Sequence, residues 1–101
     1  MITATAVQLA KQGSEANLIA LMKDLTVKVK VNEPGCTIFL YVKSNDKPRT
    51  YLVIEQYKDQ QAFDFHHSTD YLKAFIPQMM SCLEAGPEVS TYSDVFTASP
   101  S

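Results

Sequence analysis

The chain has 101 residues, enough for one domain, and 46% of them are apolar, as in an ordinary folded protein rather than a disordered one. Its formal charge is −2 and its nine Lys and Arg residues are scattered, which argues against a nucleic-acid partner. Two cysteines make no disulfide framework, and the first residues lack a secretory signal. No apolar run reaches the ~20 residues of a membrane span. We therefore expect a cytoplasmic protein without a membrane partner.

The first part of the chain predicts a strand, a helix and a second strand. Small and β-branched residues alternate over 2–10, as they do in strands. Ser14 is placed to cap a helix over 15–30, where apolar residues recur at helical spacing. A Pro-Gly turn at 33–35 then breaks the chain before a strand over 36–43.

The middle of the chain predicts a third strand and two helices. A polar loop leads into a strand over 50–57, and Asp59 is placed to cap a short helix over 60–67. Ser68 is placed to cap a second helix with an apolar stripe. Pro77 lies inside this stretch, so we expect it to kink or restart the helix near residue 76.

A last strand over 88–96 completes the order β-α-β-β-α-β. This order is typical of the α+β ferredoxin-like fold, in which helices cover one face of a four-stranded antiparallel sheet. We expect residues 1–96 to form this single domain and residues 97–101 to form a flexible C-terminal tail.

The two middle strands do not alternate between apolar and polar residues. Residues 38–42 and 51–54 are apolar at every position, so both faces of the sheet require burial, yet the chain supplies helices for only one. We therefore expect a homodimer through the second face of the sheet. The alternative is that loops or the C-terminal tail cover this face.

Three segments of the chain carry residues in a distinctive order. Around the third strand lie a strand-ending Glu, an aromatic two residues on, an Asp at the helix start, an Ala, a His eleven residues after the Glu, a Ser and a Lys-Ala-Phe segment, which are Glu55, Tyr57, Asp59, Ala62, His66, Ser68 and residues 73–75. A Glu-Pro-Gly-Cys turn at 33–36 precedes this stretch, and a Gly-Pro-Glu-Val segment at 86–89 follows it. Together these segments, which cover nearly the whole chain, resemble the antibiotic biosynthesis monooxygenase family.

This resemblance implies a dimeric α+β barrel with a pocket between the sheet and the helices of each protomer. Many relatives oxygenate quinols or polyphenols without metal, flavin or haem, whereas others are isomerases or haem-degrading enzymes. Haem degradation is disfavoured, because that branch carries a Trp at the position of His66, a haem-ligating His at Ile76 and an Asn in the first strand, where residues 2–10 contain none. We therefore expect no cofactor.

His66 and Glu55 are the candidate catalytic residues. A neutral imidazole beside a carboxylate can take a proton from a phenol at neutral pH, and the resulting anion is electron-rich enough to react with O₂. The alternative is structural, since Glu55 and His66 could bond each other and anchor the helix to the strand. Two His residues without nearby Cys or a carboxylate triplet make no metal signature.

Aromatic residues are the candidate substrate-binding residues, although ordinary core packing is the better explanation for each of them; they are Tyr57, Tyr51, Tyr41, Tyr71 and Phe75. Together these features predict a cofactor-independent monooxygenase that uses O₂ on a small quinol or polyphenol. Two alternatives stay open: an isomerase of a small carbonyl compound that uses the same His66 and Glu55, and a non-catalytic dimeric ligand-binding module.

Overall fold

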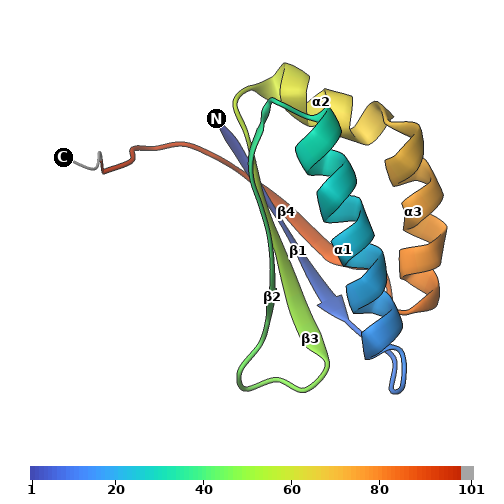
Figure 1. Ribbon diagram of the computed structural model, residues 1–101. Helices are drawn as coiled ribbons and strands as arrows, with labels where there is room; N and C mark the ends of the chain where they lie inside the picture. Colours follow the sequence, from blue (N-terminus) through green and yellow to red (C-terminus); the bar gives the residue numbers. More distant parts are fainter. Residues whose placement is uncertain (99–101) are drawn as a thin grey trace.

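A computed structural model of the chain describes residues 1–98, and its helices and strands follow the predicted order (Figure 1). The elements are β1 (Ile2–Leu9), α1 (Glu15–Asn32), β2 (Cys36–Lys43), β3 (Thr50–Tyr57), α2 (Gln60–Ser68), α3 (Asp70–Ser81) and β4 (Glu88–Ser93). The α+β ferredoxin-like prediction is therefore confirmed. Within residues 1–98, no helix is long and apolar enough to cross a membrane.

The sheet has the strand order β2-β3-β1-β4, and each neighbouring pair is antiparallel. Helices α1 and α3 cover one face of it, while α2 lies across one end (Figure 1). The core lies between these layers and is built from the apolar stripes of both helices and the inward residues of β3, among them Leu18, Met22, Leu25, Val29, Tyr51, Val53, Leu72, Phe75 and Met79. This packing fixes where α2 and its side chains meet the sheet.

The turn between α1 and β2 is held tightly against the start of α2. The Cys36 amide donates to the Glu33 carbonyl at 3.0 Å, and the Lys58 amide donates to the Gly35 carbonyl at 2.9 Å. A Cβ at Gly35 would lie 2.5 Å from the Cβ of Ala62, which leaves room only for glycine. The turn therefore carries Glu33 to the same end of the sheet as α2.

Of the three predicted helix caps, one is confirmed and one is shifted by one residue, while Ser14 stands at the N-cap position of α1 without a side-chain capping bond. The Asp59 carboxylate accepts from the Ala62 amide at 2.8 Å, as expected of an N-cap. The cap of α3 is Thr69, whose hydroxyl oxygen accepts from the Leu72 amide at 3.4 Å. The prediction that Ser68 caps this helix is wrong, because Ser68 ends α2 and its hydroxyl donates to the Phe65 carbonyl at 2.7 Å.

Two further predictions need correction. Helix α3 runs through Pro77, so it does not restart near residue 76, and buried residues on both sides of the proline, Phe75 and Met79, hold it to the core. Strand β4 ends at Ser93 rather than at residue 96, because Ser93 pairs with Ile2 and β1 extends no further.

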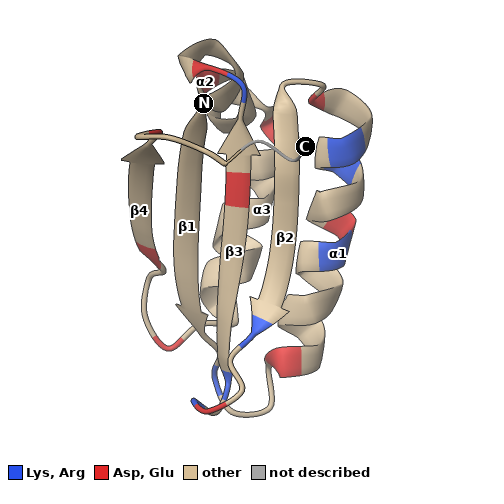
Figure 2. Cartoon of the chain, turned by 90° about the vertical axis from the view of Figure 1, so that its left-hand side faces the viewer, with Lys and Arg blue, Asp and Glu red and all other residues tan. Residues whose placement is uncertain are grey.

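The face of the sheet opposite the helices is open and apolar. Exposed side chains from β1 and β2 lie on it, namely Val7, Ile38, Leu40 and Val42. Figure 2 views this face, and most of the length of β1, β2 and β3 carries no charged residue. Leu40 pairs across the sheet with Ile54, and Val42 pairs with Leu52, so the apolar rows continue onto β3.

The C-terminal segment does not cover this face within the described residues. Residues 94–98 are exposed and run away from the sheet on its open side, with Val95 and Phe96 at 90% and 88% exposure (Figure 1). The alternative of a tail that covers the second face finds no support in these residues. Of the predicted flexible tail at 97–101, residues 99–101 lie outside the described part of the chain.

Candidate functional site

His66 occupies the junction between α2 and the sheet. The Asp59 cap starts α2 directly after β3, so the inward face of this short helix lies over the end of the sheet. The His66 side chain is only 4% exposed, and its ring lies between those of Phe39 and Tyr57, with centroids at 6.1 and 5.5 Å. The imidazole is therefore surrounded by protein.

Two carboxylates flank this imidazole. His66 Nδ1 lies 2.9 Å from both Oε1 and Oε2 of Glu33, and His66 Nε2 lies 3.6 Å from Oε1 of Glu55. A proton on Nδ1 is donated to Glu33, and one on Nε2 faces the Glu55 carboxylate. Each ring nitrogen of His66 therefore faces a carboxylate oxygen.

Two phenols complete the arrangement. The Tyr57 hydroxyl donates to Glu55 Oε1 at 2.5 Å, and the Tyr71 hydroxyl donates to Glu33 Oε2. Burial, followed by the adjacent carboxylate, raises the pKa of both Tyr57 and Tyr71 well above the ordinary value. Both phenols therefore stay protonated at neutral pH and act as donors to the carboxylates.

We call these five side chains, Glu33, Glu55, Tyr57, His66 and Tyr71, the His66 cluster. Its members come from the α1–β2 turn, β3, α2 and α3. Proton acceptors and donors alternate around the imidazole, so a proton taken up by the cluster can be shared over several groups. This is the arrangement that a general base requires, and it is also a strong structural tie between four segments.

The structure brings some of the predicted site residues together and separates others. His66 and Glu55 meet as predicted, and Tyr57 and Tyr71 join them through the carboxylates. Tyr41 and Tyr51 instead stack on each other, with ring centroids 5.3 Å apart and planes inclined by 9°. Since Tyr51 precedes Tyr57 by six residues along β3, this pair lies roughly 20 Å from the cluster.

The Tyr41 and Tyr51 pair has its own polar partners. The Tyr41 hydroxyl donates to the buried Gln8 Oε1 at 2.7 Å, and the Tyr51 hydroxyl donates to Glu15 Oε1 at 2.7 Å. Phe75, the fifth predicted aromatic residue, lies in the hydrophobic core. These three residues occupy positions that core packing explains.

Glu33 is the member of the His66 cluster that the sequence does not single out. The sequence indicates it only as part of a turn, yet its side chain is 2% exposed and contacts both His66 and Tyr71. A signal exists in the sequence, because the turn at 33–36 is part of the family pattern and its proline and glycine already account for the bend. The glutamate is not needed for the bend, which leaves its carboxylate available for another contact.

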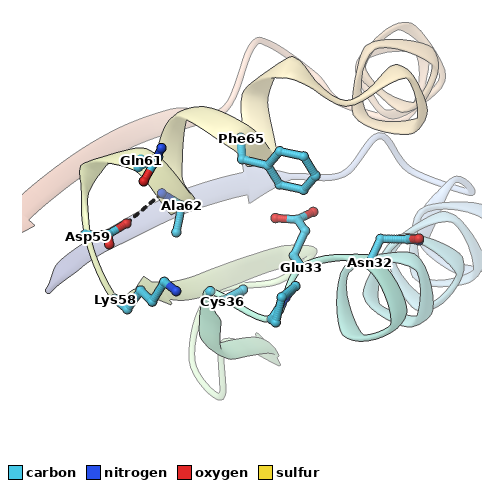
Figure 3. Close-up of a pocket in the computed structure, with 10 residues that line it drawn as sticks. Asn32, Glu33, Cys36, Lys58, Asp59, Gln61, Ala62 and Phe65 are labelled. Carbon is cyan, nitrogen blue, oxygen red and sulfur yellow. Dashed lines mark hydrogen bonds between the residues drawn. The ribbon is translucent and has the colours of Figure 1, made fainter.

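A groove with a cavity volume of about 470 Å³ lies between the α1–β2 turn and α2 (Figure 3). Glu33 is the member of the His66 cluster that lines it. The other lining residues are Asn32, Pro34, Gly35, Cys36, Lys58, Asp59, Gln61, Ala62 and Phe65. Among residues 1–98, no group of three or more His, Cys, Asp and Glu side chains is placed to hold a metal ion.

Comparisons with known proteins agree with this fold and motif order. The sequence model of the antibiotic biosynthesis monooxygenase family matches residues 1–78. A solved structure from Caulobacter crescentus that is named for this family is 29% identical, with a TM-score of 0.89, and the alignment covers 94% of this chain and 90% of that one. A solved protein from Shewanella oneidensis is 32% identical over 90% of this chain and 87% of that one, with a TM-score of 0.82.

A curated relative, an uncharacterised protein of Synechocystis, is 23% identical over 82 residues, which are 81% of this chain. The match spans only 55% of that protein, so this chain corresponds to about half of the length of that curated relative. The family match covers most of the chain and includes all five members of the His66 cluster. The chain therefore belongs to the antibiotic biosynthesis monooxygenase family.

Proposed function

We propose that this protein is a cofactor-independent monooxygenase of a small quinol or polyphenol, with the His66 cluster as the proton-accepting centre. The observation that carries the proposal is the buried imidazole held between two carboxylates, with Nδ1 at 2.9 Å from Glu33 and Nε2 at 3.6 Å from Glu55. The substrate class and the independence from cofactors come from the family resemblance.

The first step is removal of a phenolic proton by the cluster. The substrate proton passes to Glu33 and is shared with His66 through Nδ1, while Glu55 faces the other ring nitrogen. The substrate anion then gives one electron to O₂, and the two radicals combine into a peroxide on a ring carbon. Collapse of the peroxide to a carbonyl breaks the O–O bond, so one oxygen atom enters the product and the other leaves as water. The protein contributes deprotonation, orientation and exclusion of water.

Oxygen uptake with a panel of hydroquinones and naphthoquinols tests this proposal. We expect uptake above the autoxidation background in the wild-type protein and its loss in His66→Ala. The matched control is His67→Ala, because His67 is the next residue of α2, is exposed and bonds only the Phe63 carbonyl. Equal uptake by both variants would contradict the proposal. Substrate conversion without uptake would favour the isomerase, and binding without conversion the ligand-binding module.

We also propose that two copies pair through the open face of the sheet. Val7, Leu40 and Val42 are exposed there, and the apolar rows continue onto Leu52 and Ile54 of β3. Such a contiguous face is larger than soluble monomers usually expose. A second copy is the occupant whose shape and chemistry match, because a two-fold axis places the same apolar rows against each other.

We also propose that the protein is cytoplasmic. Cys36 and Cys82 are both free thiols, as is usual in a reducing compartment. Fractionation of the native host would test it.

A further inference from the structure

We infer that the groove beside Glu33 is the binding site for the substrate's aromatic ring, with Glu33 as the hydrogen-bond acceptor for its hydroxyl group and Phe65 as the surface on which the ring packs. The inference rests on the proposed function only for the class of ligand, a small ring with two hydroxyl groups. The proposed site differs from the one predicted from the sequence, because none of the five predicted aromatic residues lines the groove.

The walls of the groove are fixed before any ligand arrives. The Lys58 amide holds the Gly35 carbonyl at 2.9 Å, and the Asp59 cap orders the first turn of α2. No side chain fits between Gly35 and Ala62, so the two walls meet at their base. A cavity of about 470 Å³ with rigid walls falls in the size range of small-molecule sites.

The Glu33 carboxylate provides a specific acceptor in this groove. It points toward the ring of Phe65 in Figure 3, although it is only 2% exposed. A carboxylate offers about four lone-pair positions, and the bonds from His66 and Tyr71 leave at least one of them unused. We assign this remaining position to the ligand hydroxyl as its acceptor.

Two exposed groups complete the recognition of a ring with two hydroxyl groups. Phe65 is 50% exposed, which is unusual for a large aromatic residue, and a stacked ligand ring would bury it. The Lys58 ammonium lines the same groove, and within residues 1–98 it forms no ion pair. It can donate to the second ligand oxygen or stabilise the phenolate form.

This placement connects the groove to the His66 cluster. A ligand hydroxyl bonded to Glu33 is separated from His66 Nδ1 by one carboxylate. The proton that the ligand releases stays within the hydrogen-bonded cluster, and the ring stays in the groove where O₂ can reach it.

Nuclear magnetic resonance titration with resorcinol tests the inference. Resorcinol carries two hydroxyl groups in a 1,3 arrangement and cannot form a simple quinone, so its binding is measured without oxidation. We expect amide shifts at Gly35, Cys36 and Ala62, and a dissociation constant about tenfold weaker in Phe65→Ala. The matched control is Phe96→Ala, an exposed phenylalanine outside the groove, which should leave the constant unchanged.

Three outcomes would overturn the inference. The first is amide shifts confined to residues around Tyr41 and Tyr51, and the second is an unchanged dissociation constant for resorcinol in Phe65→Ala. The third is the absence of any shift at millimolar resorcinol. These outcomes are separate from those of the oxygen assay. Resorcinol shifts in the groove without oxygen uptake by any quinol would retain the site and reject the oxygenase. Oxygen uptake whose KM is the same in Phe65→Ala and wild type would retain the oxygenase and reject the groove.

Discussion

At the scale of single residues, Glu33 connects the groove to the His66 cluster. Its carboxylate accepts from His66 Nδ1 and from the Tyr71 hydroxyl, and both contacts span more than 30 residues of sequence. Truncation would leave a buried imidazole and a half-buried phenol without their acceptor. The same carboxylate therefore contributes both to the fold and to the chemistry of the site.

Glu33→Ala should lower the free energy of unfolding by about 3 kcal/mol, because it removes one partner of a buried, hydrogen-bonded pair. Urea denaturation followed by circular dichroism measures this loss. Glu84→Ala is the control, since Glu84 is exposed and should change stability by less than about 0.5 kcal/mol. Equal losses in the two variants would show that the Glu33 contacts contribute nothing to stability.

The pKa of the Cys36 thiol responds to its burial and to the negative charges of the His66 cluster. Burial, then the negative charges of Glu33 and Glu55, raises the pKa of its thiol to about 11, against about 9 in the unfolded chain. At pH 8 the native thiolate population should be about 100-fold smaller, so iodoacetamide should modify native Cys36 about 100-fold more slowly than the unfolded chain. Mass spectrometry of the Cys36 peptide measures both rates.

The direction of the accompanying pH effect follows from the same shift. Below pH 9 the Cys36 thiol is protonated in both the native and the unfolded state, so the free energy of unfolding does not change with its titration. Between pH 9 and 11 the unfolded chain loses the thiol proton before the native protein does, so the free energy of unfolding falls as the pH rises. Cys36→Ser should reduce this alkaline loss. Equal rates of Cys36 modification by iodoacetamide in the native and the unfolded chain would contradict the raised pKa of this thiol.

Part of this site could be predicted from the sequence. The eleven-residue spacing predicted that Glu55 and His66 belong together, because a strand end and the helix that follows it are neighbours in space. The role of Glu33 depends on how the α1–β2 turn packs on α2, which is a tertiary contact that local patterns do not encode. Tyr41 and Phe75 could not be separated from site residues for the same reason.

At the scale of elements, the junction of α2 and α3 holds His66 in place. The Thr69 hydroxyl donates to the His66 carbonyl at 2.8 Å and its oxygen accepts from the Leu72 amide at 3.4 Å, so one buried side chain joins both helices. The neighbouring Ser68 hydroxyl is exposed and bonds only within α2.

Thr69→Ala should therefore lower the free energy of unfolding by about 1 kcal/mol, as expected for the loss of a helix cap. Ser68→Ala is the matched control and should cost less than about 0.5 kcal/mol. Thermal and urea denaturation of the two variants measure the difference. A larger loss in Ser68→Ala than in Thr69→Ala would return the cap to the position that the sequence suggested.

Element boundaries were predictable where local chemistry sets them. The strands at 36–43 and 50–57 were predicted to the residue, because a Pro-Gly turn and polar loops delimit their apolar runs. The predictions failed where packing decides. Ser68 and Thr69 are both suitable caps by residue type, and the core contacts of α3 override the proline at residue 77.

At the scale of the whole molecule, the open apolar face of the sheet is the feature from which we propose a partner. The apolar runs of β2 and β3 predicted that both faces need burial, and the structure exposes the second face as an apolar surface. The sequence predicts a second copy as the occupant, and this stays a prediction, because an interface between copies leaves the same pattern as any other buried face.

Sedimentation equilibrium at micromolar concentration should give about twice the 11.3 kDa mass of the chain. Leu40→Lys should shift the protein to the monomer, because it places a charge in the centre of the open face. Val27→Lys is the control, since Val27 is an exposed apolar residue on α1, away from this face. A wild-type monomer, or equal dissociation in both variants, would reject pairing through the sheet.

The reaction itself is tested most directly by the isotope content of its product. A quinol that supports oxygen uptake is converted under ¹⁸O₂ in ordinary water, and the product is weighed by mass spectrometry for the wild type, His66→Ala and His67→Ala. The proposed chemistry predicts one ¹⁸O atom in each product molecule for the wild type and His67→Ala, and only background conversion for His66→Ala. Product that carries no ¹⁸O, or labelled product formed at the wild-type rate by His66→Ala, would contradict a monooxygenase centred on the His66 cluster.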